Sequence, residues 1–82
     1  MNRFGEKLRT LRERRDLSLK QLGDLLGVSK TFLWELEMGK KTPNIAMLTK
    51  ICDVFGVGCD KLIRDEIELD HEPSAHEKES AG

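Results

Sequence analysis

This chain of 82 residues has little histidine, a side chain that enzymes often use for acid–base chemistry and metal binding. Its two histidines, His71 and His76, both fall in an acidic stretch where we expect no rigid frame to hold them. There is no glycine-rich phosphate loop and no nucleophile beside a suitable base. The sequence therefore argues against an enzyme, and it indicates no cofactor, no metal site and no small-molecule ligand.

Cysteine and long apolar runs are also scarce. Cys52 and Cys59 are seven residues apart, which matches no zinc or redox motif, and we expect Cys52 to be a small buried hydrophobe on a helix. No apolar run approaches the length of a membrane span, and the charged start MNRFGEKLRTLRERR is unlike a signal peptide. We therefore expect a cytoplasmic protein without membrane contact, in which a disulfide between the two cysteines would not form.

The charges nearly cancel, at −1 overall, but they are unevenly distributed. Residues 1–65 hold 13 lysines and arginines against 9 acidic residues, a balance of +4, whereas residues 66–82 have a balance of −5. The sequence predicts a basic folded domain at 1–65 and an acidic, largely disordered tail at 66–82. A basic domain suits a nucleic-acid partner, because the local field over the docking face governs such binding.

The spacing of apolar residues predicts an all-α fold of five helices. The first should run over about 3–15 and a short fifth over about 59–64. Ser18, which forms a capping-box pattern with Gln21, should open the second helix, Ser29 the third and Asn44 the fourth. We expect these side chains to face inward: Phe4, Leu8, Leu11, Leu22, Leu25, Leu26, Phe32, Leu33, Leu36, Ile45, Leu48, Ile51, Cys52, Phe55, Leu62 and Ile63.

The second and third predicted helices are joined by the tight turn Leu26-Gly27-Val28-Ser29, in which glycine supplies a permissive backbone. Gly39 then ends the third helix, and Pro43 prevents its continuation. Two short helices around a glycine-containing turn form the layout of a helix-turn-helix, whose second helix enters the DNA major groove. Sequence-specific binding of double-stranded DNA is therefore the leading hypothesis.

In the order and spacing of its motifs, the chain resembles the Cro and phage-repressor (XRE-type) family of helix-turn-helix regulators over about residues 4–63. The residues that carry the resemblance are Leu22, Gly27-Val28-Ser29, Leu36-Glu37-Met38-Gly39, Pro43, Phe55-Gly56-Val57 and Asp60-Lys61-Leu62. The resemblance implies a compact five-helix bundle of the lambda-repressor-like type, usually dimeric, that binds a short palindromic operator and often controls its own promoter. It also implies an internal ion pair at the positions of Arg12 and Glu37, which we interpret as structural.

Two positions depart from the family pattern. Leu19 stands where a glutamine commonly contacts a phosphate, so that backbone contact should be missing. Gly23 stands where alanine is usual; glycine also allows close helix packing but lowers helix propensity.

The outward stripe of the third predicted helix holds the candidate base-reading residues. Lys30, Thr31 and Glu35 match family positions that reach base edges, and Trp34 lies on the same face. Lys30 suits guanine O6 and N7, and Glu35 suits the cytosine N4 amino group. The Thr31 methyl group or the Trp34 ring suits a thymine methyl group.

Ser18, Lys40 and Lys41 are the candidates for phosphate contact, because a helix start and basic loops both attract anions. One recognition helix covers only half of an operator, so we expect a homodimer with its two recognition helices about 34 Å apart. The expected dimer surface is the fifth helix with its flanks, unless these residues complete the core instead: Leu62, Ile63, Ile67 and Leu69.

The alternative to a DNA-binding repressor is a protein-interaction module, such as an antitoxin or an anti-repressor. An outward Trp34 and Met38, the missing glutamine and the acidic tail all fit that alternative. The positive charge of Lys30, Lys40 and Lys41 favours DNA instead, since a pure interaction module has no need for it.

Overall fold

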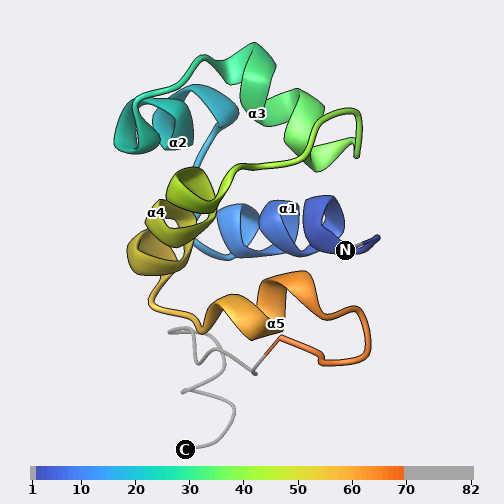
Figure 1. The fold of residues 1–82 in the computed structure, drawn as a ribbon. Helices are drawn as coiled ribbons and strands as arrows, with labels where there is room; N and C mark the ends of the chain where they lie inside the picture. The colour runs from blue at the N-terminus through green and yellow to red at the C-terminus, as the bar shows by residue number, and fades with distance from the viewer. Residues whose placement is uncertain (1, 70–82) are drawn as a thin grey trace, which may run out of the picture.

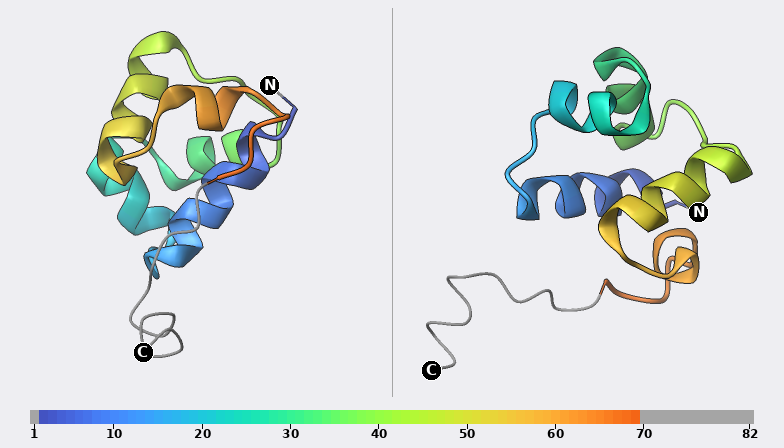
Figure 2. Two further views of the ribbon diagram at one scale, coloured as in Figure 1. Left: turned by 90° about the horizontal axis from the view of Figure 1, so that it is seen from below. Right: turned by 90° about the vertical axis from the view of Figure 1, so that its left-hand side faces the viewer.

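Five α-helices make up most of the computed structural model, which describes residues 2–69. They are α1 (Phe4–Arg14), α2 (Leu19–Leu26), α3 (Lys30–Glu37), α4 (Ile45–Phe55) and α5 (Cys59–Ile63). Helix α1 lies between the α2–α3 pair and α5, and α4 packs against both α2 and α5 (Figure 1, Figure 2). The predicted all-α fold class is confirmed, whereas the predicted tail lies outside the described residues from residue 70 onward.

Side-chain caps set the starts of three helices at the predicted residues. Ser18 Oγ accepts a hydrogen bond from the Gln21 amide at 3.0 Å, and Gln21 Oε1 accepts one from the Ser18 amide at 2.8 Å. Ser29 caps α3 at 3.1 Å, and Asn44 caps α4 at 2.8 Å. Each cap satisfies an amide that lacks an intrahelical acceptor. Gly27 ends α2 with φ 75°, a left-handed conformation that favours glycine.

The core is a single cluster of apolar side chains from all five helices. Its buried members are Phe4, Leu8, Leu11, Leu22, Leu26, Leu33, Leu36, Ile51, Cys52, Phe55 and Leu62. All of these were predicted to face inward, which shows that the helical periodicity of the sequence locates most of the core.

Two residues predicted to face inward are exposed, Leu25 by 54% and Ile45 by 83%. The buried arc of α2 is centred between Leu22 and Gly23, and Leu25 lies about 100° around the helix from that centre. Ile45 belongs to the first turn of α4, where residues 44–46 are all exposed, so this turn projects beyond the core.

Lys7 of α1 is a charged residue, yet it is only 1% exposed. Its ammonium group donates to the backbone carbonyl oxygens of Lys61 at 2.6 Å, of Arg64 at 2.8 Å and of Ile67. The last carbonyl groups of a helix have no intrahelical partner, and a cation there also interacts favourably with the helix dipole. Lys7 therefore caps the C-terminal end of α5 from a neighbouring helix.

The start of α1 is capped in return by the segment after α5. Asp65 accepts hydrogen bonds from the backbone amides of Asn2 at 3.0 Å and Arg3 at 2.9 Å, and the Arg3 guanidinium pairs with Glu68. Leu69 packs against the core. Residues 65–69 therefore run back beside α1 (Figure 2).

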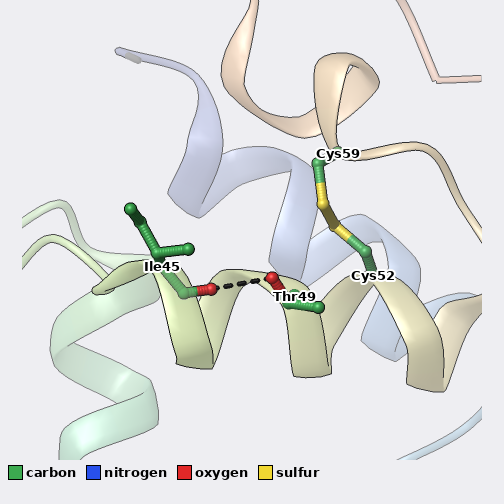
Figure 3. The surroundings of a disulfide bond; sticks show 4 residues. All are labelled: Ile45, Thr49, Cys52 and Cys59. Atoms are coloured by element: carbon green, nitrogen blue, oxygen red, sulfur yellow. Dashed lines mark hydrogen bonds between the residues drawn. A yellow bond between two sulfur atoms is a disulfide. The ribbon is translucent and has the colours of Figure 1, made fainter.

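The expectation that Cys52 and Cys59 stay unbonded is wrong, because a disulfide joins α4 to α5 (Figure 3). The two Cα atoms are 5.7 Å apart, which is within the range that a disulfide spans. The chain reverses at Gly56, where φ is 64°, and this reversal brings the start of α5 back toward the last turns of α4. A seven-residue spacing alone does not reveal that proximity.

Candidate nucleic-acid interface

The four predicted base-reading side chains lie on one side of α3. Leu33 and Leu36 of this helix are fully buried, so the residues on its other side face outward. Lys30, Thr31 and Trp34 are exposed, Trp34 by 43%, whereas the Glu35 side chain is 27% exposed. The outward side of α3 therefore carries an ammonium group, a carboxylate, a hydroxyl group and an indole ring, while the opposite side of the helix is buried.

A shallow hollow of about 290 Å³ lies between the first turn of α2 and this face of α3. Its lining residues are Leu19, Lys30, Thr31 and Trp34. Helix α2 approaches the turn closely because Gly23 has no side chain: a Cβ atom there would lie 2.6 Å from the Val28 carbonyl oxygen. The glycine that departs from the family's alanine therefore fits a close backbone contact.

Leu19 is a residue of this surface that sequence reasoning did not assign to it. The sequence pattern treated it as a missing phosphate contact, whereas the structure places it beside Thr31 and Trp34. The available signal was helical spacing, because Leu19 precedes Leu22 by three positions and Leu26 by seven on the apolar side of α2.

The two loop lysines fold back onto the end of α3. The backbone amides of Lys40 and Lys41 donate to the Glu35 carbonyl oxygen at 2.8 and 3.3 Å. Lys40 Nζ lies 5.5 Å from the centroid of the Trp34 ring, and Lys41 Nζ lies 3.5 Å from Glu35 Oε1. The structure thus brings the predicted phosphate-binding lysines into contact with the predicted base-reading residues, through a cation–π contact and an ion pair.

Ser18 is exposed at the start of α2, as its predicted phosphate contact requires. Its hydroxyl oxygen accepts from the Gln21 amide, which leaves the hydroxyl hydrogen available for another acceptor. The first amides of α2 also carry the positive end of the helix dipole. An anion such as a phosphate is favoured there by both features.

Helix α3 is held in place by the ion pair expected between Arg12 and Glu37. Arg12 Nε donates to Glu37 Oε2 at 2.7 Å, and its second terminal nitrogen donates to Oε1 at 3.1 Å. The side chains are only 13% and 5% exposed, and the bidentate hydrogen bonding to Glu37 raises the pKa of Arg12. Arg12 also donates to the Leu17 carbonyl oxygen at 2.9 Å. One guanidinium therefore connects α1, the α1–α2 loop and the end of α3.

Close backbone packing supplements this pair. A Cβ atom on Gly5 of α1 would lie 2.6 Å from the Leu36 carbonyl oxygen, so α1 crosses directly beneath the end of α3.

Among residues 2–69, no group of three or more histidine, cysteine or acidic side chains could hold a metal ion. None of the helices described is long and apolar enough to cross a membrane.

A short capped helix, a glycine turn and a second helix with an outward polar face define a helix-turn-helix domain. Residues 3–64 match the family model described as a helix-turn-helix domain, and the chain belongs to that family. The resemblance to Cro and phage-repressor-type regulators is confirmed by its relatives and structural neighbours.

Two curated relatives come from Bacillus subtilis strain 168. The SPbeta prophage-derived uncharacterized HTH-type transcriptional regulator YonR is 33% identical over 61 residues, which cover 74% of this chain and 56% of the relative. The HTH-type transcriptional regulator AnsR is 32% identical over 72 residues, which cover 88% of this chain and 62% of the relative. The chain thus matches little more than half the length of these relatives.

Among solved structures, the N-terminal DNA binding domain of SinR from Bacillus subtilis superposes with a TM-score of 0.73 at 26% identity. The match covers 83% of this chain and 100% of the SinR domain. The family and the fold are therefore those of helix-turn-helix transcriptional regulators.

Proposed function

We propose that the chain is a sequence-specific DNA-binding repressor that reads a short palindromic operator as a homodimer. The observation that carries the proposal is the surface of α3. Lys30, Thr31, Trp34 and Glu35 project from a helix whose opposite side is fully buried, and the two loop lysines adjoin it. A recognition helix needs such a combination of varied polar edges and nearby positive charge.

Each of these side chains has a partner in the major groove. The Lys30 ammonium group donates to guanine O6 and N7, and the Glu35 carboxylate accepts from the cytosine N4 amino group. Thr31 and Trp34 offer apolar contact to a thymine methyl group. Each good bidentate contact discriminates between bases by about 1–3 kcal/mol.

The phosphate contacts fix the register of the protein on the duplex. Ser18 presents its hydroxyl hydrogen and the start of α2, while Lys40 and Lys41 supply charge beside the end of α3. These contacts make affinity depend on salt, because each neutralised phosphate releases condensed counterions.

Repression requires only that the bound protein occupy DNA that the polymerase needs. A site upstream of the protein's own gene would make the repressor autoregulatory. The curated relatives carry names of transcriptional regulators, which supports a role in the control of transcription.

The proposed dimer would supply the second half-site. Of the residues predicted to form its surface, Leu62 is fully buried in the core of the chain and is not available. Ile63, Ile67 and Leu69 are half-buried, so each retains some surface at and after α5. Light scattering over a range of concentrations should show a species of twice the chain mass, and a mass that stays monomeric in the presence of DNA would contradict the dimer.

The test of DNA reading is fluorescence anisotropy with the DNA upstream of the protein's own gene, against a shuffled duplex at several salt concentrations. We expect preference for the native duplex, and we expect Lys30→Ala to erode it. Lys20→Ala is the matched control, because Lys20 is an exposed lysine of α2 that pairs with Asp24. Equal and weak binding to both duplexes would contradict an operator upstream of the protein's own gene. Failure to enrich any sequence from a random duplex pool would overturn DNA reading altogether.

A protein partner is the second candidate, and it rests on the exposure of Trp34 and Met38. Aromatic and methionine side chains are enriched where proteins bind one another. If no duplex is preferred, the same two residues become the positions at which to test an antitoxin-like or anti-repressor interaction.

A further inference from the structure

Leu19 lies at the edge of the buried side of α2. It is the first residue of the helix, directly after the Ser18 cap, and it shares the apolar stripe of Leu22 and Leu26. It packs partly against the core, and the rest of it lines the hollow shared with α3. The exposed part of this side chain therefore presents an apolar surface beside the outward side of α3.

The walls of the hollow are apolar where they are formed by the Leu19 isobutyl group, the Trp34 ring and the Thr31 methyl group. Both sides are held in place. The capping box fixes the first turn of α2, and Lys40 lies over the Trp34 ring at 5.5 Å. The volume of about 290 Å³ gives room for the major-groove edge of one pyrimidine.

Among base edges in the major groove, a methyl group is present only on thymine and on 5-methylcytosine, in both cases at C5. Amino groups, carbonyl oxygens and ring nitrogens would lose hydrogen bonds to water against this apolar part of the lining, and only the Lys30 ammonium group and the Thr31 hydroxyl group at its edge could replace them. A methyl group gains from the same transfer. The apolar part of the hollow, formed by Leu19, Thr31 and Trp34, therefore favours the C5-methyl group among the edges that DNA presents.

We propose that the hollow between Leu19, Thr31 and Trp34 binds the C5-methyl group of a pyrimidine, and that Leu19 is a specificity-determining residue. Thymine is the ordinary ligand. Methylation of a cytosine at the same place supplies an equivalent group, so affinity at that position responds to cytosine methylation. This inference rests on the proposed DNA-reading function and adds a residue of α2 to it.

The experiment begins with a duplex that the protein prefers, selected from a random pool. Each thymine of this duplex is replaced in turn by deoxyuridine, which removes the methyl group alone. We expect one position of each half-site to lose affinity about fourfold, which corresponds to the burial of one methyl group. Cytosine and then 5-methylcytosine at that position should differ by about the same factor, which shows that the methyl group is read wherever it comes from.

Variants at position 19 connect the effect to the hollow. Leu19→Gln should reduce the thymine-to-deoxyuridine difference to less than about twofold, whereas Leu19→Met, which keeps an apolar wall, should preserve most of it. Leu25→Ala is the matched control, because Leu25 is an exposed leucine of the same helix that does not line the hollow. Thermal melting of each variant establishes that it folds.

The outcomes separate this inference from the function on which it rests. If a duplex is preferred but no deoxyuridine substitution weakens binding, the methyl site is refuted while DNA reading stands. A methyl effect that is the same in wild type and Leu19→Gln also overturns the role of Leu19. If selection enriches no duplex at all, both the methyl site and the proposed function fail.

Discussion

Lys41 Nζ lies 3.5 Å from Glu35 Oε1, so a lysine predicted to contact phosphate is paired with a carboxylate predicted to read a base. The Lys41 side chain is 53% exposed and retains room for a second contact. Two roles are therefore open to it, a direct contact with the DNA backbone and the orientation of Glu35. They differ in a measurable way, because only a phosphate contact releases counterions.

We expect Lys41→Ala to weaken binding to all duplexes similarly and to reduce the salt slope of log affinity by about 1. Glu35→Ala should instead relax the preference at one base pair by about 1–3 kcal/mol. Anisotropy titrations at several salt concentrations, with duplexes altered at each position, distinguish the two. If Lys41→Ala leaves the salt slope unchanged but loses the same base preference as Glu35→Ala, then Lys41 acts only by orienting Glu35.

The Arg12–Glu37 pair should contribute strongly to stability. Arg12→Met leaves the Glu37 carboxylate, which is only 5% exposed, without its partner, and we expect the free energy of unfolding to fall by about 3–5 kcal/mol. Arg9→Met is the control on the same helix, since Arg9 and Glu13 are 62% and 57% exposed and their pair should contribute less than about 1 kcal/mol. Urea unfolding followed by circular dichroism measures both. Similar losses in the two variants would contradict the structural role of the buried pair.

Lys7 should stabilise α5 more than any surface lysine does. Lys7→Met keeps the apolar stem but leaves the carbonyl groups of Lys61, Arg64 and Ile67 without this donor, and we expect a loss of about 2–4 kcal/mol. Amide hydrogen exchange should accelerate first in α5. Lys20→Met, at an exposed lysine, should leave both the stability and the exchange pattern unchanged. If exchange accelerates equally in all helices of Lys7→Met, Lys7 does not act as a local cap of α5.

The parts of the fold that follow from neighbouring residues could be predicted from the sequence. The caps at Ser18, Ser29 and Asn44 depend on residues three positions away, and the buried stripes depend on helical periodicity. The outward side of α3 follows in the same way, because Leu33 and Leu36 determine which side is buried. Local chemistry therefore locates both the helices and the candidate site.

Contacts between distant residues account for what the sequence did not reveal. Lys7 looks like a surface cation until the segment at 61–67 folds against it, and nothing near Asp65 in the sequence indicates that it caps α1. The periodicity of α4 also cannot show that its first turn, with Ile45, extends past the helices that would cover it. Likewise, the hollow at Leu19 exists only once α2 and α3 are packed together.

A fall in pH should weaken the contacts between the start of α1 and residues 65–69. Hydrogen bonds from the amides of Arg3 and Asn2 lower the pKa of Asp65 below its ordinary value of 3.8, and the hydrogen bond from Arg3 lowers the pKa of Glu68. Because folding favours the ionised form, this stabilisation is present above about pH 4 and is lost as the pH falls through the lowered folded-state pKa.

We expect Asp65→Asn to have a shallower decline of unfolding free energy below about pH 4 than the unaltered chain. Asp24→Asn is the control, since Asp24 makes an exposed pair with Lys20 within α2. Urea unfolding at a series of pH values gives the slopes. An acid decline in Asp65→Asn as steep as that of the unaltered chain would show that Asp65 does not contribute to it.

Reduction of the disulfide should destabilise the chain without changing its fold. The Cys52–Cys59 bond closes a loop with a sequence separation of seven, for which chain-entropy arguments give a stabilisation of about 2.5 kcal/mol. A dithiol reductant should therefore lower the free energy of unfolding by about that amount, with α5 losing protection from amide exchange first. The double substitution Cys52→Ala with Cys59→Ala should be insensitive to the reductant and resemble the reduced chain. The same response to reductant in this variant and the unaltered chain would rule out the disulfide as its cause.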